Sequence, residues 1–348
     1  MSKPHAAIGR ATSNGLDSPT TMAHNHYCTL FDRNYLIKGV AMMTSLFAHS
    51  PDARVHVLCM DDVTHTILSR MALPAVASLI RLSELETPEL LEVKGKRSVA
   101  EYCWTLSPSL PWYVLREHPE IDRITYLDAD LFFYSPVQPL FDEIGGASIA
   151  IIEHRFIPRL QHLDVKGRFC VEWVTFRRDE TGIACLNQWR EQCIEWCYNR
   201  LEDNRMGDQK YLDAWPQTWP SVCILQHSGA GIAPWNYARY DIGIDARKRV
   251  VVDGAPLVFY HFHQFQILRG DRFDRLSTYY SVERPAPEPI YERYEAAIRT
   301  TLEDIRRVSP GFSDGVKPWL PVYTRRLANN YAPFWLKERV KQWVSRAR

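Results

Sequence analysis

Asp128 and Asp130 follow an apolar run and carry the strongest chemical signal in the sequence. We expect the strand over 123–134 to give way to a loop at this point, which lets both carboxylates approach one ion. Carboxylate oxygens suit Mg²⁺ and Mn²⁺, and such an ion can hold the phosphates of a nucleoside diphosphate and neutralise a leaving group. A D-x-D pair alone also describes a loop of solvated aspartates, so its meaning depends on the rest of the chain.

Histidine and cysteine pairs offer further candidate ligands. His261 and His263 end the apolar run 257–263 and share one face of an extended strand, so either imidazole can be the one that reaches an ion. Cys193 and Cys197 have the i,i+4 spacing of a helix face, which fits a shared metal. Tryptophans on the same face favour buried thiols instead.

The apolar pattern predicts an α/β chain that would position these residues. Strands are expected over 26–31, 54–60, 123–134, 147–152, 169–176 and 257–263, and helices over 36–48, 85–118, 185–200 and 286–308. The second of these helices is expected to be interrupted at Ser107 to Pro111. A strand, a helix and a strand closed by Asp61-Asp62 are typical of the opening of a nucleotide-binding domain. The sequence contains neither the glycine fingerprint of a dinucleotide fold nor a P-loop.

Three regions follow from composition. Residues 1–23 predict a flexible leader, 24–275 one catalytic domain, and 276–348 a helical C-terminal extension that ends in a basic, aromatic tail. The tail 324–348 has a net charge of +6, and its aromatic side chains interleave with the cations. We expect it either to lie on an anionic membrane surface or to dock its aromatic residues on the catalytic domain.

Composition also limits partners and location. The 348 residues are 46% hydrophobic and 24% charged, with a formal net charge of +1, which excludes the global basic field of a nucleic-acid-binding protein. The sequence has no secretory h-region and no apolar stretch of transmembrane length. Eight cysteines without a C-x-x-C pair indicate a reduced chain. We therefore expect a cytoplasmic protein, peripheral on the inner face of the cytoplasmic membrane.

Four ordered segments resemble one enzyme family: Cys28 to Leu36, Tyr126 to Leu131, Gly207 to Asp213, and Leu257 to Phe262. In that order they resemble the nucleotide-sugar glycosyltransferases of the GT-A fold, specifically glycosyltransferase family 8, whose bacterial members include lipopolysaccharide galactosyl- and glucosyltransferases. The resemblance covers residues 26–265. It implies a Rossmann-like mixed sheet flanked by helices.

The resemblance also implies roles for the chemical residues. Asp128 and Asp130 would bind Mn²⁺ or Mg²⁺, with His261 as the third protein ligand. Asp208 and Gln209 would face the donor sugar and the reaction centre. Residues with an implied nucleotide-binding role are Thr29, Phe31, Asp32, Tyr35, Ala129 and His263.

Two departures from the family pattern concern the donor site. Where the family often has an asparagine and, two residues later, a small residue, this chain has Cys170 and Glu172. Glu172 is expected to contact sugar hydroxyls, to act on the acceptor nucleophile, or to be a surface strand residue. The family's basic residue before the D-x-D motif is missing at its usual place, and Lys96 or Arg97 is expected to replace it in nucleotide binding.

These observations predict a metal-dependent transferase that moves a hexose from a nucleotide-diphosphate sugar, UDP-hexose by preference, to a hydroxyl of a cell-surface glycan or lipopolysaccharide acceptor. The resemblance suggests retention of anomeric configuration. The alternatives are a non-catalytic sugar-binding protein on a degenerate transferase fold and a D-x-D phosphohydrolase.

Overall fold

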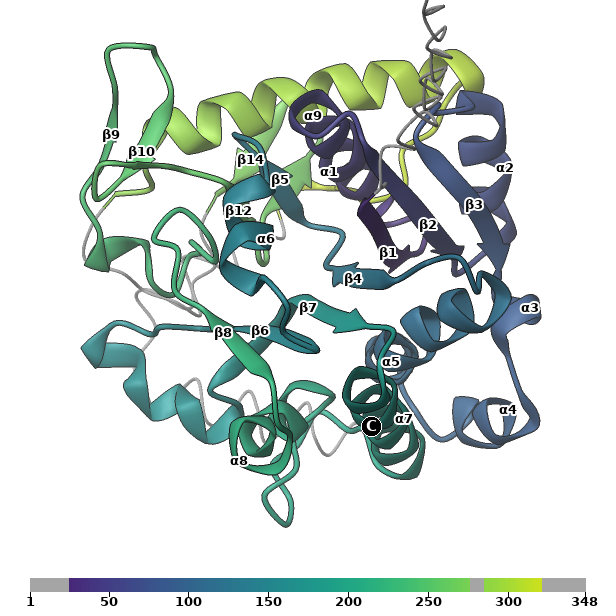
Figure 1. Cartoon of the computed structure of the whole chain (residues 1–348). Coiled ribbons are helices and arrows are strands. Elements are labelled where there is room, and N and C mark those ends of the chain that lie inside the picture. The colour runs from purple at the N-terminus through teal and green to yellow at the C-terminus, as the bar shows by residue number, and fades with distance from the viewer. Residues whose placement is uncertain (1–24, 276–284, 321–348) are drawn as a thin grey trace, which may run out of the picture.

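The computed structural model describes residues 25–275 and 285–320, which form a mixed α/β fold around a seven-stranded sheet (Figure 1). In spatial order the strands are β3 (Val76–Arg81), β2 (Ala53–Cys59), β1 (Asn25–Phe31), β4 (Arg123–Leu127), β7 (Phe169–Arg177), β6 (Ile149–Glu153) and β8 (Val222–Leu225). The first four are parallel, β7 is antiparallel to β4 and β6, and β6 is parallel to β8. The predicted mixed sheet flanked by helices is therefore confirmed.

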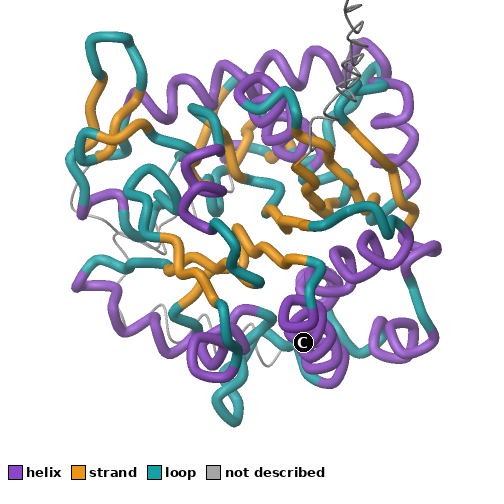
Figure 2. Tube along the Cα trace, in the orientation of Figure 1, coloured by secondary structure: helices purple, strands orange, loops and turns teal. Residues whose placement is uncertain are grey.

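Helices cover both faces of this sheet (Figures 1 and 2). One layer contains α1 (Leu36–His49), α2 (Asp62–Met71), α6 (Gln138–Ile144) and α9 (Glu288–Val308). The other contains α3 (Leu82–Leu85), α4 (Pro88–Lys94), α5 (Val99–Glu117), α7 (Glu180–Glu195) and α8 (Trp215–Thr218). Side chains of β1 alternate between the layers, because Tyr27 and Phe31 join the α1 layer whereas Cys28 and Leu30 join the α5 layer.

Smaller sheets extend the domain beside its main sheet. β5 (Leu131–Phe133) pairs antiparallel with β12 (Phe259–His261). The other short strands are β9 (Ile242–Ile244), β10 (Val250–Val252), β11 (Ala255–Pro256), β13 (Gln266–Leu268), β14 (Arg272–Asp274) and β15 (Val316–Lys317). The described residues also form the 3₁₀ helices η1 (Pro158–Lys166), η2 (Gln209–Ala214) and η3 (Tyr237–Arg239).

The predicted helix over 85–118 is interrupted, but not at the predicted place. α3, α4 and α5 succeed one another, and α5 begins at a capping box in which Ser98 and Glu101 exchange hydrogen bonds. α5 then continues through Pro108 and Pro111. A proline inside a helix costs about 3 kcal/mol, and here both prolines are buried where α5 packs against the sheet and α7. The prediction of a break at Ser107 to Pro111 was wrong because tertiary packing outweighs this local cost.

The predicted C-terminal helix over 286–308 is confirmed as α9, and its buried residues belong to the same hydrophobic core as β1 and α1. Tyr291 and Tyr294 are fully buried, and the Tyr134 hydroxyl donates to the Ile290 carbonyl at 2.7 Å. The predicted leader over 1–23 and the basic tail over 324–348 lie outside the described residues. Within 25–275 and 285–320, no helix combines the length and apolar character needed to span a bilayer.

Candidate functional site

The D-A-D turn lies where the main sheet ends. β4 ends at Leu127, and the chain turns through Asp128 and Asp130 before β5 begins. Because β7 is antiparallel to β4, it begins at the edge where β4 ends, and the backbone N–H of Asp128 donates to the Glu172 carbonyl at 3.2 Å. The predicted strand over 123–134 is thus two strands, and the break between them leaves Asp128 partly exposed and Asp130 buried.

The short β5–β12 ladder brings a histidine to the same turn. Its register places His261 opposite Leu131, one residue after Asp130. The Phe262 N–H donates to the Asp130 carbonyl at 2.8 Å, which fixes the end of β12 against the turn. Backbone hydrogen bonds therefore bring together residues more than 130 positions apart in sequence.

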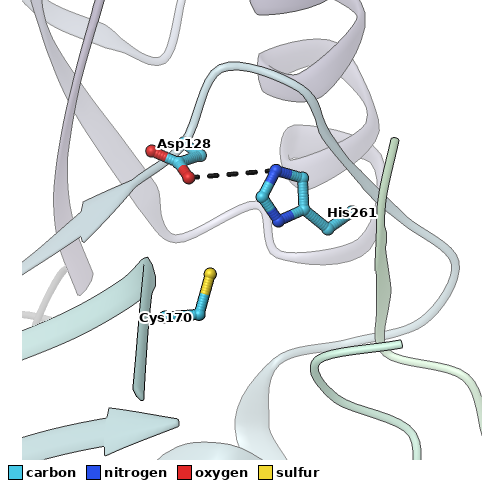
Figure 3. A group of neighbouring side chains, drawn as sticks. All are labelled: Asp128, Cys170 and His261. Carbon is cyan, nitrogen blue, oxygen red and sulfur yellow. Dashed lines mark ion pairs between the residues drawn. The ribbon is translucent and has the colours of Figure 1, made fainter. Parts of the chain in front are cut away.

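Both aspartates face one nitrogen of His261. Its Nε2 lies 3.0 Å from Asp130 Oδ1 and 3.8 Å from Asp128 Oδ2, and Figure 3 shows the second pair. Neighbouring ligands on an octahedral ion with bonds of 2.0–2.1 Å lie about 3 Å apart. Each carboxylate is therefore placed to share a divalent cation with the His261 imidazole.

Two overlapping groups of side chains offer ligand atoms within 4.8 Å of one another, and both include His261. One combines it with Asp130 and His263, the other with Asp128 and Cys170. In Figure 3 the Cys170 sulfur points toward the gap between Asp128 and the imidazole. Burial raises the pKa of this thiol to about 12, so it is protonated at neutral pH. His261 is common to both groups, which makes it the central candidate ligand.

Two further charged side chains surround the cluster. Glu172 is fully buried on β7, and its Oε2 lies 2.6 Å from His261 Nδ1. Lys38, buried on α1, places its Nζ 3.7 Å from Asp130 Oδ2 and 4.6 Å from the centre of the Tyr35 ring. Asp130 therefore lies between an imidazole and an ammonium group, and the imidazole lies between carboxylates.

These contacts shift the pKa values of the two aspartates in opposite directions. Burial raises the pKa of Asp128 to about 7, with help from neighbouring carboxylates. Burial also opposes ionisation of Asp130, but His261 and then Lys38 hold its pKa well below the ordinary value. Burial would lower the pKa of His261, but Asp130 raises it well above the usual range. Burial and the charge of His261 lower the pKa of His263 to about 3, which leaves a neutral imidazole.

A first cavity of about 390 Å³, here called the β1 cavity, lies between the end of β1, the start of α5 and the D-A-D turn. Phe31, Asp32 and Tyr35 line it together with Ala129. The Asp32 carboxylate accepts from the backbone N–H groups of Asn34 and Tyr35 at 2.9 and 3.2 Å, which holds this loop in shape. The cavity thus has an aromatic side beside the candidate metal ligands.

A second cavity of about 500 Å³, the β7 cavity, lies on the other side of the cluster. Asp208 and Gln209 line it, and Gln209 donates from Nε2 to the Lys166 carbonyl at 2.9 Å. Burial, together with the charge of Asp128, raises the pKa of Asp208 to about 7. The two cavities share Trp104, Asp128, His261 and His263, so they meet at the candidate metal site.

The structure brings most of the predicted site residues to these cavities but not three of them. Thr29 is buried on the β1 face that α1 covers. Arg97 donates to the Cys193 and Ile194 carbonyls near the end of α7, because a buried guanidinium needs acceptors. Glu172 lies behind His261 and lines neither cavity. Its interpretation as a surface strand residue was wrong, since it is 0% exposed.

Sequence reasoning missed several residues of the site. Lys38 is a lysine inside the apolar run of a helix, a pattern that signals a buried charge with a partner. His154 and Trp104 line the β7 cavity from a loop and from α5, and no spacing rule links them to the D-x-D motif. Cys193 and Cys197 are fully buried, which confirms the prediction of buried thiols, and all eight cysteines are free.

Comparisons with known proteins find close sequence relatives and more distant structural ones. YfnD of Bacillus subtilis is 33% identical over 301 residues, and the match covers 85% of this chain and 96% of YfnD. YfnF of the same organism is 31% identical over 296 residues, and the match covers 82% of this chain and 96% of YfnF. Both relatives are described as uncharacterized. No protein-family model matches the chain.

Two solved glycosyltransferases are similar at lower identity. Galactosyltransferase LgtC in complex with donor and acceptor sugar analogs is 16% identical, with 79% of this chain and 95% of LgtC covered and a TM-score of 0.47. GlyE of Streptococcus pneumoniae TIGR4 is 13% identical, with 82% and 64% covered and a TM-score of 0.47. Similarity at this level of identity does not assign an activity to the chain.

Proposed function

The chain belongs to the family of the Bacillus subtilis proteins YfnD and YfnF, and we propose that it is a metal-dependent glycosyltransferase. It would move a hexose from a nucleotide-diphosphate sugar, for which we expect UDP-hexose, to a hydroxyl of a cell-surface glycan or lipopolysaccharide acceptor. The observation that carries the proposal is that two cavities meet at Asp128, His261 and His263. A donor can span this junction with its diphosphate at the acidic cluster.

The β1 cavity fits the nucleoside half of such a donor. Tyr35 and Phe31 offer aromatic rings on which a base can stack, and Asp32 offers a carboxylate that can accept from ribose hydroxyls. Ala129 lies between the two metal-ligand candidates on the wall of this cavity. We therefore place the base in the β1 cavity and direct the diphosphate toward His263 and the D-A-D turn.

The sugar half of the donor would lie in the β7 cavity. Asp208 and Gln209 can bind its hydroxyls there, while the acceptor enters from the same cavity. Asp128, Asp130 and His261 would hold Mn²⁺ or Mg²⁺, which when bound neutralises charge developing on the leaving diphosphate. His261 and then Lys38, whose ammonium group lies beside the buried carboxylate, hold the pKa of Asp130 well below its ordinary value and keep it ionised.

We expect the reaction to retain the anomeric configuration, and the positions of the carboxyl groups bear on this. Glu172 was one candidate for the base of an inverting reaction, but it lines neither cavity. Asp208 lines the β7 cavity apart from the candidate metal ligands, and its pKa of about 7 suits proton transfer near neutral pH. NMR comparison of the donor and product anomers decides the outcome; an inverted product would overturn retention, and the loss of turnover in Asp208→Asn would then test Asp208 as the base.

The proposed membrane contact concerns a different part of the chain. We propose that the tail 324–348, with its net charge of +6, binds the anionic inner face of the cytoplasmic membrane, where a glycolipid acceptor would be available. Sedimentation of the full chain with anionic and neutral vesicles tests this. Equal binding to both vesicle types would count against an electrostatic contact.

A donor panel tests the proposed function directly. Binding and hydrolysis of UDP-, GDP- and CMP-sugars are measured with Mn²⁺ present or chelated, for the native chain, Asp130→Ala and the control Asp304→Ala on α9. We expect metal-dependent use of one UDP-sugar by the native chain and the control, and at least a 100-fold loss in Asp130→Ala. Binding without turnover would favour a sugar-binding protein, and failure of every nucleotide-sugar to bind would overturn the donor site.

A further inference from the structure

We propose that Glu172 is a positioning residue that holds the His261 imidazole with Nε2 directed at the two aspartates, and so sets the affinity of the site for a divalent cation. The inference rests on the proposed function, because it takes His261 as a metal ligand. It assigns Glu172 neither to the donor sugar nor to the acceptor. Its chemistry is that of a carboxylate behind a ligating histidine.

The hydrogen bond between Glu172 and His261 fixes which ring nitrogen is available. Glu172 Oε2 lies 2.6 Å from His261 Nδ1, within the range of a charge-assisted hydrogen bond. A carboxylate accepts, so Nδ1–H donates and the lone pair for a metal must come from Nε2. That atom is the one 3.0 Å from Asp130 Oδ1 and 3.8 Å from Asp128 Oδ2.

The surroundings of Glu172 hold it in place. Its side chain is 0% exposed on the central antiparallel strand β7, and its own carbonyl accepts from the Asp128 N–H. The backbone of Gly231 approaches it closely: a Cβ there would lie 3.1 Å from Glu172 Oε1 and 2.6 Å from Ile152 Cδ1. Gly231 has φ +68, a conformation that favours glycine. The carboxylate is therefore enclosed by backbone and sheet.

A second contact restrains the imidazole itself. The Trp235 indole packs edge-on to the His261 ring, with centroids 5.2 Å apart and planes at 82°. Trp235 donates from Nε1 to the His154 carbonyl at 2.8 Å, and the adjacent Asn236 amide donates to the same carbonyl at 2.8 Å. With the ring held by Trp235 and hydrogen-bonded by Glu172, His261 has little freedom to turn Nε2 away from the aspartates.

The position of Glu172 argues against direct contact with a substrate. It lines neither cavity, whereas Asp208 and Gln209 line the β7 cavity. Its side chain is 0% exposed, so the Glu172 carboxylate offers no surface to a donor sugar. Its effect on the reaction must therefore pass through the imidazole.

Mn²⁺ affinity measured by electron paramagnetic resonance tests the proposal without reference to turnover. Loss of a carboxylate that orients a metal-bound histidine typically weakens metal binding about 10- to 100-fold. We expect Glu172→Leu to weaken Mn²⁺ binding by this factor and Glu172→Gln, which can still accept from Nδ1–H, to weaken it less. Thr175→Val is the matched control, since Thr175 is a buried residue of the same strand whose hydroxyl bonds only Thr125 among the contacts of the described chain.

A double-mutant cycle shows whether Glu172 acts through His261. In a His261→Asn background, Glu172→Leu should cause no further loss of Mn²⁺ affinity; an equal loss in both backgrounds would overturn the proposal. Pulsed measurements on bound Mn²⁺ should show imidazole ¹⁴N coupling in the native chain, a reduced coupling in Glu172→Gln, and the loss of the His261 contribution in His261→Asn, with His261→Asn/His263→Asn as the variant that removes both candidate imidazoles. If Glu172→Leu does not fold, the double-mutant cycle is measured with Glu172→Gln instead.

The outcomes separate this inference from the proposed function. Mn²⁺ bound without ¹⁴N coupling, together with normal donor turnover, would overturn the role of Glu172 and leave the transferase intact. No Mn²⁺ binding by the native chain would overturn both the inference and the metal dependence of the proposed function.

Discussion

At the scale of single residues, Asp128 and Asp130 have opposite electrostatic environments although one alanine separates them. Asp130 is buried between His261 and Lys38, which hold its pKa well below the ordinary value. Asp128 is 30% exposed, and burial with neighbouring carboxylates raises its pKa to about 7. An ionised Asp128 therefore destabilises the metal-free fold, whereas the same charge favours a bound cation.

The sign of the pH dependence follows from these shifts. Asp128 and Asp208, both with a pKa of about 7, bind their protons more tightly in the folded chain than in the unfolded one, where aspartate titrates near 3.9. The metal-free protein should therefore lose stability as the pH rises from about 4 to about 7. The raised pKa of His261 acts in the same direction, because its stabilising proton is lost at high pH. Asp130 loses its contribution only in strong acid.

We predict that Asp128→Asn stabilises the metal-free protein at pH 8 while weakening Mn²⁺ binding. The gain should be on the order of 1 kcal/mol, less than the full pKa shift implies, because the side chain is 30% exposed. Urea unfolding from pH 5 to 8 measures it, with the surface variant Asp122→Asn as control. If Asp128→Asn had the same stability as the native chain, with the same dependence on pH, the Asp128 charge would not be destabilising.

At the scale of elements, the close approach of α1 to β1 shapes the β1 cavity. A Cβ on Gly39 would lie 2.5 Å from Phe31 Cε1, so the absence of a side chain lets the helix pack against this ring. Phe31 also lines the β1 cavity, where we place the nucleotide base. The position of one aromatic wall of the site therefore depends on a glycine that does not itself line that cavity.

We predict that Gly39→Ala destabilises the protein by about 1–3 kcal/mol, although alanine is the better helix former. Displacement of the Phe31 ring should also raise the KM for the donor. Gly95→Ala is the matched control, because a Cβ there meets nothing within 4 Å. Denaturant unfolding and donor kinetics on both variants measure the effects. Equal free energies of unfolding for Gly39→Ala and Gly95→Ala would show that the Phe31 ring can move aside without loss of stability.

At the scale of the whole molecule, α9 supports the site from outside the main sheet. The rings of Tyr294 and Phe262 stack with centroids 3.6 Å apart, and Phe262 lies between His261 and His263 in sequence. The Tyr260 and Tyr291 hydroxyls are 3.0 Å apart, which adds a second tie between β12 and α9. The strand that carries the candidate ligand is therefore held by a helix that begins 27 residues after His261.

We predict that Tyr294→Ala costs about 3–5 kcal/mol and weakens Mn²⁺ binding, because it removes a buried ring from behind β12. Tyr294→Phe should be neutral or slightly stabilising, since the buried hydroxyl has no hydrogen-bond partner in the described part of the chain. Urea unfolding and Mn²⁺ titration of Tyr294→Ala and Tyr294→Phe separate the contribution of the ring from that of the hydroxyl. A loss of Mn²⁺ affinity in Tyr294→Phe would mean that the hydroxyl has a role in the site.

The sequence by itself determined the local features of this protein. Periodicity located β1, α1, β2, β7 and α9 within a few residues, because apolar spacing directly reflects which face of an element is buried. The D-A-D pair and His261 stood out because their side chains suit metal ligation and each follows or ends a strand. Local pattern failed where packing competes with it, as in α5, which continues through Pro108 and Pro111.

Only the tertiary structure decided how distant residues meet. Lys38 on α1 contacts Asp130, and Glu172 on the antiparallel strand β7 contacts His261. Arg97 does not line the predicted nucleotide site and instead donates hydrogen bonds to carbonyls near the end of α7. These contacts depend on strand order and on the direction of β7, which no spacing along the chain encodes. A buried charged side chain needs a partner nearby, and the fold decides which residue that partner is. The role of such a side chain therefore depends on its neighbours in the tertiary structure.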